Sequence, residues 1–208
     1  MQNFMKQGLF IAVEGPNGVG KSTLIDKVAG NLLRMGCKVL KTKEPTETEL
    51  GQWIRKRHDA IHGRILACLI AADRYEHIET VIQPALDSNT VVLSDRYLAS
   101  SFVYQVADGV PVEFVRAVNS DVKVSDLTVC IFAEKETIAK RMKMRKELTR
   151  FEKVLTSEKE IQLYRTACEE LRSMGWAVAE YVNEDERAEA LGDEIANRII
   201  EIRKTQQK

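Results

Sequence analysis

Short apolar runs alternate along the chain with longer amphipathic stretches. Continuous runs of apolar residues, without a polar residue at every second position, are typical of strands buried on both faces of a sheet. The clearest is 9–13, and weaker ones follow along the chain. The sequence predicts five strands, at 9–13, 38–40, 91–93, 127–132 and 176–182.

Helical patterns fill the gaps between these strands. The clearest lies within 63–86, where apolar residues recur every three or four positions and mark an amphipathic helix. Strands that alternate with helices indicate βαβ units and an α/β fold, with a parallel sheet of about five strands covered on both faces. The predicted helices are 22–35, 63–86, 98–107, 111–119, 135–147, 157–173 and 185–203. There is no internal repeat, low-complexity tract or linker, so residues 1–208 are expected to form a single domain.

Composition places the chain among ordinary globular proteins. Hydrophobic residues make up 44% and charged residues 30%, which excludes disorder, collagen and a disulfide scaffold. Lys plus Arg and Asp plus Glu both count 31, so the chain lacks the basic excess typical of non-specific nucleic-acid binding. The longest apolar run, 65–72, is too short for a membrane helix, and residues 1–8 have no signal-peptide core. We expect a cytoplasmic protein without nucleic-acid or membrane partners.

The cysteines and histidines give no sign of a metal site. The four cysteines are widely separated among apolar neighbours, so we expect reduced core residues at Cys37, Cys68, Cys130 and Cys168. His58 and His62 are four residues apart but have no third ligand at a suitable spacing. We therefore interpret these two and His77 as surface residues.

A glycine-rich segment after the first strand carries the strongest chemical signal. It fits the pattern G-x-x-x-x-G-K-[ST], in which backbone N–H groups surround a polyphosphate, the lysine neutralises the phosphates and the hydroxyl binds Mg²⁺. The segment follows a predicted strand and precedes a predicted helix, whose N-terminus favours the same anion. The residues expected to bind ATP are Gly15, Pro16, Asn17, Gly18, Val19, Gly20, Lys21, Ser22 and Thr23.

Other motifs narrow the class of phosphate-loop protein. The chain has neither the D-x-x-G and N/T-K-x-D motifs of guanine-nucleotide switches nor the L-S-G-G-Q signature of transporter ATPases. A small kinase or an uncommon ATPase remains. Asp95 ends an apolar strand, where it either joins the Mg²⁺ shell or caps the next helix. Arg96 either holds an acceptor phosphate with its planar fork or is merely solvated.

The ordered motifs between residues 9 and 152 resemble those of thymidylate kinases. They are 10–23, Lys43-Glu44-Pro45, 71–74, Asp95-Arg96-Tyr97, Ser101-x-x-Tyr104-Gln105 and Arg150-x-Glu152. The resemblance implies a nucleoside monophosphate kinase fold that moves the γ-phosphoryl group of ATP to an acceptor such as dTMP, with Mg²⁺. It also implies which residues hold the acceptor: Asn17, Lys43, Glu44, Ile70, Arg74, Arg96, Ser101, Tyr104, Gln105, Phe151 and Glu152.

Several positions depart from the family pattern, three of them among the expected acceptor-binding residues. Asn17 stands where the family usually has an acid that helps to hold the acceptor sugar, and Lys43 replaces an arginine. Ile70 replaces the aromatic residue that stacks on the base, while Arg74, which reads the pyrimidine edge in the family, is retained. Ile70 is therefore either a wall of the base pocket or an ordinary core residue.

A basic segment within 140–152 is expected to form a small lid. Five of the seven residues from Lys140 to Lys146 are basic, which by itself usually marks a solvated helix face. The phosphate loop carries no arginine between its glycines, however, so charge that develops during phosphoryl transfer must be met from elsewhere. By resemblance to bacterial-type lids, the candidates for catalysis are Arg141, Arg145 and Arg150, together with Lys21 and Asp95. Ser22 and Asp95 are the expected Mg²⁺ ligands.

The sequence predicts an ATP- and Mg²⁺-dependent kinase of a deoxypyrimidine monophosphate, with dTMP as the expected acceptor. Two alternatives remain at this stage: a related kinase with another acceptor, such as a modified pyrimidine nucleotide, and a non-catalytic nucleotide-binding module. The resemblance also implies a homodimer that pairs through about 63–86 and the segment after Asp95.

Overall fold

The computed structural model describes residues 8–143, 150–184 and 187–206. All strands in these residues join one sheet, in the spatial order β2-β3-β1-β4-β5, and every neighbouring pair is parallel. The strands are β1 (Leu9–Glu14), β2 (Lys38–Lys43), β3 (Thr90–Asp95), β4 (Leu127–Phe132) and β5 (Val178–Val182). The predicted five-stranded parallel sheet is confirmed.

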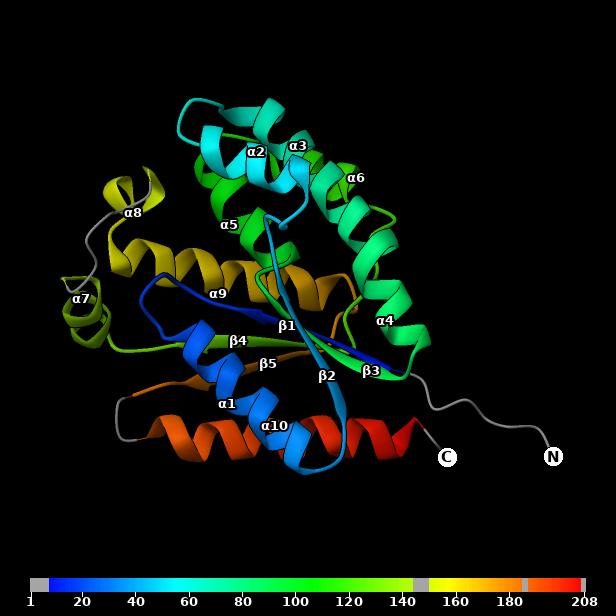
Figure 1. The fold of residues 1–208 in the computed structure, drawn as a ribbon. Helices are drawn as coiled ribbons and strands as arrows, with labels where there is room; N and C mark the ends of the chain where they lie inside the picture. The colour runs from blue at the N-terminus through cyan, green and yellow to red at the C-terminus, as the bar shows by residue number, and fades with distance from the viewer. Residues whose placement is uncertain (1–7, 144–149, 185–186, 207–208) are drawn as a thin grey trace.

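Helices cover both faces of this sheet (Figure 1). On one face lie α1 (Lys21–Arg34) and α10 (Ala188–Thr205), and α5 (Leu98–Ala107) and α9 (Ser157–Ser173) cover the other. The remaining helical segments are α2 (Glu49–Arg57), α3 (Gly63–His77), the π-helical turn η1 (Ile78–Ile82), α4 (Gln83–Asp87), α6 (Val112–Val118), α7 (Lys135–Lys143) and α8 (Arg150–Val154).

The central strand β1 shows how one sequence supplies two cores. All six of its residues are buried. Successive side chains of a strand point to opposite faces, so Phe10 and Ala12 join the core beneath α5 and α9, whereas Leu9, Ile11 and Val13 join the core beneath α1 and α10. The absence of polar alternation in this strand therefore has a direct structural cause.

The helices differ from the prediction in two ways. The single helix expected over 63–86 is interrupted by the π-helical turn η1, which comes just before Pro84. Proline has no N–H to donate four residues back, and a wider turn accommodates that loss. The helices α2 and α8 were not predicted. The signals for α2 are Thr48, whose hydroxyl accepts a hydrogen bond from the Gly51 N–H at the helix start, and the spaced apolar residues Leu50 and Ile54.

The cysteine prediction holds at three positions and is wrong at the fourth. Cys37, Cys130 and Cys168 are buried free thiols, but Cys68 is exposed on the outer side of α3. Within the described residues, no helix combines the length and apolar content needed to cross a bilayer.

The sheet register brings the candidate residues to one edge. Val13 of β1 and Lys43 of β2 both pair with Asp95 of β3. The segments that follow these strands therefore meet at the carboxyl edge of the sheet, which is where ligands bind in open parallel sheets.

Candidate active site

The glycine-rich loop after β1 is shaped by close backbone contacts. Gly15 has a φ of +140°, and a Cβ atom there would lie 2.1 Å from the carbonyl oxygen of Ile131. Gly20 has a φ of +87°, and its Cβ would lie 2.8 Å from Nδ2 of Asn183. Glycine is required at both positions because a side chain would collide and the backbone is left-handed. The loop leads directly into α1, so the N-terminus of that helix faces the same space.

This loop borders a cavity of about 320 Å³, called here the phosphate cavity. Its lining residues are Asn17, Gly18, Gly20, Lys21, Ser22, Thr23, Lys43, Glu44, Asp95 and Arg96. All of them are predicted site residues, which the fold brings together at the ends of β1, β2 and β3. Lys43 also forms an ion pair with Glu47, with 2.6 Å between Nζ and Oε1.

Lys21 lies almost fully buried beneath the loop. Its ammonium group donates hydrogen bonds to the carbonyl oxygens of Gly15 and Pro16, at 2.7 and 2.8 Å. Burial and, after it, the positive charge of Arg96 lower the pKa of Lys21 to about 7, against the opposing effect of nearby carboxylates. An anion in the phosphate cavity would restore the charged form of this lysine.

Ser22 and Asp95 form the pair expected to hold Mg²⁺. The Ser22 hydroxyl donates to Oδ2 of Asp95 at 2.7 Å, so two oxygen ligands lie side by side at the cavity wall. Magnesium prefers such oxygen ligands and commonly takes the rest from phosphates and water. The alternative, that Asp95 caps the next helix, is not what the geometry shows, because the backbone N–H groups of Tyr97 and Ser100 donate to Glu14 instead.

Arg96 links the phosphate cavity to its neighbour. Its φ of +74° is rare for a residue with a side chain, and such strain gathers at functional sites. The guanidinium donates to Oδ1 of Asn17 at 2.7 Å and to the hydroxyls of Tyr104 and Tyr164 at 3.1 and 2.8 Å. Arg96 is thus held in place rather than solvated.

A second cavity of about 330 Å³ adjoins Arg96 and is called here the base cavity. It is lined by Asn17, Pro45, Ile54, Arg55, His58, Leu66, Ile70, Arg96, Tyr104, Gln105 and Phe151. Ile70 is therefore a cavity wall. The rings of Tyr104 and Phe151 lie 4.9 Å apart between centroids. Oε1 of Gln105 is buried and receives no hydrogen bond within the described part of the chain.

Arg74 and Ser101 lie outside the base cavity. Arg74 is 1% exposed, and its guanidinium donates to Oε2 of Glu44 at 2.9 Å, to Oδ1 of Asn119 at 2.6 Å and to the Ser101 hydroxyl at 3.0 Å. The ring of His77 lies 3.1 Å from the other carboxylate oxygen of Glu44. His77 is fully buried, so its assignment to the surface is wrong. It belongs to an ion-paired network that fixes Glu44.

The lid arginines occupy separate places. Arg141 donates to the carbonyl oxygens of Val19 and Asn183, both at 3.2 Å, beside the phosphate loop. Arg150 instead pairs with Asp108, at 2.9 Å, and lies over the ring of Phe151, which lines the base cavity. Glu152 belongs to α8, and Arg145 lies outside the described residues.

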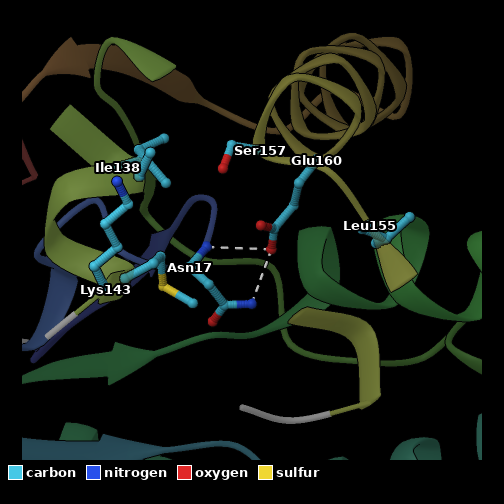
Figure 2. A pocket seen from close by; sticks show the side chains of 8 residues that line it. Asn17, Ile138, Lys143, Leu155, Ser157 and Glu160 are labelled. Atoms are coloured by element: carbon cyan, nitrogen blue, oxygen red, sulfur yellow. Dashed lines mark hydrogen bonds between the residues drawn. The ribbon is translucent and has the colours of Figure 1, made fainter. Parts of the chain in front are cut away.

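A third cavity, of about 220 Å³, contains a residue that the sequence interpretation missed. Its lining residues are Asn17, Ile138, Ala139, Met142, Lys143, Leu155, Ser157 and Glu160. Figure 2 shows Glu160 of α9 reaching toward Asn17, and two hydrogen bonds join them. One signal was available: Glu160 is an acidic residue four positions before Tyr164, on the face of α9 that is otherwise apolar.

Two other contributions were also missed. Glu14 is fully buried at the end of β1, where burial raises its pKa, and it anchors the start of α5 beside Arg96. The signal for Glu14 in the sequence was an acidic residue at the end of an apolar strand. Ile54, Arg55 and His58 line the base cavity from α2, one of the helices that were not predicted.

Comparison with known proteins agrees with this geometry. Residues 13–191 match the family model described as thymidylate kinase. The chain belongs to the thymidylate kinase family. It is 35% identical over 192 residues to a probable thymidylate kinase of Pyrococcus abyssi, an alignment that covers 86% of this chain and 94% of that protein. It is 39% identical over 164 residues to a probable thymidylate kinase of Caldivirga maquilingensis, covering 76% and 80%.

A third relative gives the same result. The thymidylate kinase of Caldicellulosiruptor saccharolyticus is 42% identical over 146 residues, which cover 66% of this chain and 71% of that protein. The predicted family and the predicted class of enzyme, a nucleoside monophosphate kinase, are both confirmed. These relatives do not favour a different acceptor or a non-catalytic nucleotide-binding module.

Proposed function

We propose that this chain transfers the γ-phosphoryl group of ATP to dTMP, with dTDP and ADP as products. One observation carries the proposal: the phosphate cavity and the base cavity share Asn17 and Arg96. A nucleoside monophosphate places its phosphate and its base at opposite ends. An acceptor whose phosphate contacts Arg96 would therefore extend its base toward Ile70 and Gln105.

The donor phosphates would occupy the glycine-rich loop. Backbone N–H groups of the loop and the N-terminus of α1 would hold the β- and γ-phosphates, and the Lys21 ammonium would turn from its carbonyl partners to them. Ser22 and Asp95 would hold Mg²⁺, which neutralises charge on the phosphate oxygens. An oxygen of the acceptor phosphate then forms a bond to the γ-phosphorus as the bond to the ADP oxygen breaks.

The acceptor would be held by groups that the fold has already positioned. Arg96 is fixed by Asn17, Tyr104 and Tyr164, so little side-chain freedom is lost when it binds a phosphate. The buried Oε1 of Gln105 lacks a donor, and the N3–H of thymine is a donor of the right kind. Tyr104, Phe151 and Ile70 supply apolar surface to the flat faces of the ring.

The lid would supply positive charge to the transferring group. Arg141 already lies at the phosphate loop, and we propose that Arg145 and Arg150 join it when the lid closes on both substrates. Closure requires Arg150 to leave Asp108. Phe151 and Glu152 on α8 would then cover the acceptor.

An acceptor panel tests this function. Purified protein with ATP and Mg²⁺ is offered dTMP, dUMP, dCMP, dGMP and dAMP in turn, and the products are separated by anion-exchange chromatography. We expect dTDP as the main product, with dUMP a poorer acceptor. A chain that phosphorylates a purine nucleotide more efficiently than dTMP would contradict the proposed acceptor.

We further propose that the enzyme is a cytoplasmic homodimer. The apolar residues of α5 are buried within one chain, whereas α3 keeps Ile65 and Cys68 exposed, so the pairing surface would lie on α3. Light scattering should show twice the 23.6 kDa mass of one chain. A species of 23.6 kDa alone at micromolar concentration would contradict the dimer.

A further inference from the structure

Asn17 lies where these three cavities meet. It lines the phosphate cavity, the base cavity and the third cavity, the last of which Figure 2 shows. The sugar of a nucleotide lies between its phosphate and its base. A monophosphate with its phosphate at Arg96 and its base at Ile70 therefore carries its sugar past Asn17.

Glu160 brings a carboxylate to this junction. It is 5% exposed, and one oxygen, Oε1, accepts hydrogen bonds from the Asn17 backbone N–H at 3.1 Å, from Asn17 Nδ2 at 3.0 Å and from the Tyr104 hydroxyl at 2.6 Å. The second oxygen, Oε2, accepts no hydrogen bond from any residue that the structure describes. Figure 2 shows it on the side of Ser157.

The side-chain amide of Asn17 already forms hydrogen bonds with other residues of the protein. Its Oδ1 accepts from Arg96 at 2.7 Å, and its Nδ2 donates to Glu160 and to the Tyr104 hydroxyl at 3.0 and 3.2 Å. Asn17 thus connects Arg96 to Glu160, and Glu160 is the acidic residue at this junction. Because Glu160 lines the third cavity and its Oε2 has no donor among the described residues, a ligand that reaches this junction can donate a hydrogen bond to Oε2.

The chemistry of the acceptor nucleotide indicates which of its groups donates to Oε2 of Glu160. A phosphate would be repelled by a carboxylate, and the sugar of a deoxynucleoside 5′-monophosphate has one free hydroxyl, at its 3′ position. We infer that Glu160 is an acceptor-binding residue, whose Oε2 accepts a hydrogen bond from the 3′-hydroxyl of the nucleotide. This inference rests on the proposed function, and it places the sugar-binding acid on α9, 143 residues along the chain from the phosphate loop.

The test compares dTMP with its 3′-deoxy analogue in the wild-type chain and in Glu160→Gln. Glutamine keeps the shape: its carbonyl oxygen can serve the three donors, while its amino group replaces the open oxygen with a donor. A hydrogen bond to a charged group is worth about tenfold or more. In the wild-type chain, loss of the 3′-hydroxyl should therefore lower kcat/KM by about that factor. In Glu160→Gln, dTMP should fall to the level of its analogue, so that the ratio approaches one.

The matched control is Glu158→Gln, an exposed acid on the first turn of α9 that should leave the ratio at its wild-type value. A purely structural role for Glu160 would lower activity on both acceptors equally and leave the ratio unchanged, and that result would overturn the inference. Equal kcat/KM values for dTMP and its 3′-deoxy analogue in the wild-type chain would also overturn the inference, and this comparison needs no variant.

A further pair of variants places a carboxylate on the phosphate loop. Asn17→Asp alone sets two carboxylates about 3 Å apart and should impair dTMP use, whereas Asn17→Asp combined with Glu160→Gln restores a single carboxylate and should recover the preference for dTMP. A double variant without that preference counts against the inference. A wild-type chain inactive on dTMP overturns the proposed function and this inference together, whereas activity with an unchanged ratio overturns the inference alone.

Discussion

The phosphate cavity and the base cavity adjoin each other but are built in different ways. In the glycine-rich loop of the phosphate cavity, the contacts of Lys21 are local: it bonds to carbonyl oxygens five and six residues before it. Around the acceptor, the contacts join distant segments, with Asn17 bonded to Glu160 and Arg74 bonded to Asn119, 45 residues away. The glycine-rich loop is thus held largely by its own backbone, whereas the base cavity depends on how several helices pack. Substitutions in the two regions should therefore have different effects on activity and stability.

The largest effect is expected at Lys21. Lys21→Ala removes the charge beside the transferring phosphate without removing an apolar core contact, so we expect kcat to fall by about 10³-fold. Circular dichroism should show an intact fold. Lys27→Ala, on the same helix but paired with Glu189 at the surface, is the matched control and should keep its activity. Undiminished turnover in Lys21→Ala would remove the basis for assigning this loop to ATP.

On the acceptor side, Arg74 should affect stability first. Arg74→Met leaves the buried Glu44 without its strongest partner, which is expected to lower the free energy of unfolding by about 3–5 kcal/mol. Urea unfolding measures this change. Gln105→Leu is the contrast: it should leave stability nearly unchanged and lower kcat/KM for dTMP by about tenfold, since its buried oxygen has no partner to lose. An Arg74→Met chain of wild-type stability would mean that this arginine is free to read the base.

The depressed pKa of Lys21 makes ATP binding depend on pH. Without nucleotide, the pKa of Lys21 is about 7, and bound phosphates raise it. Above pH 7, ATP binding must therefore be accompanied by protonation of Lys21. The affinity for ATP should fall by up to about tenfold per pH unit between pH 7 and 9. Calorimetry in buffers of different ionisation enthalpy would detect the proton. Lys21→Met should bind ATP weakly and lose this dependence on pH, and a wild-type affinity that is constant over the same range would contradict the assignment.

The same shift affects the stability of the chain without nucleotide. Because the folded pKa lies below the ordinary value of 10.5, the unfolded chain holds more protons between about pH 7 and 10.5. The contribution of Lys21 to the free energy of unfolding should therefore increase as pH rises through that window. The difference between wild type and Lys21→Met isolates it.

The smallest effect is expected at Ile70. Stacking of an aromatic ring on a base is worth about 1–3 kcal/mol in single-strand binding, and isoleucine recovers only part of that contact. Ile70→Phe should raise kcat/KM for dTMP several-fold. A fall in dTMP activity would indicate that the cavity is shaped around isoleucine and would reopen the choice of acceptor.

The contrast between the two cavities also explains what could be predicted from the sequence. The strands, the sheet and the phosphate loop follow from short apolar runs and from a motif whose spacing has one physical meaning. The position of Arg74 could not be predicted, because its distance from Ile70 fixes the helix face but not the depth of the guanidinium. Glu160 was missed because its partner, Asn17, lies in another βα unit. An acidic residue on an apolar helix face was nevertheless a signal in the sequence.

The central claim is that one site joins an ATP phosphate to dTMP, and phosphorus NMR tests it most directly. Wild-type protein with equal amounts of MgATP and dTMP should convert them to ADP and dTDP in matched amounts, with little inorganic phosphate. ATP consumption should stop when dTMP is left out. Release of inorganic phosphate from ATP at the same rate without dTMP would contradict the account.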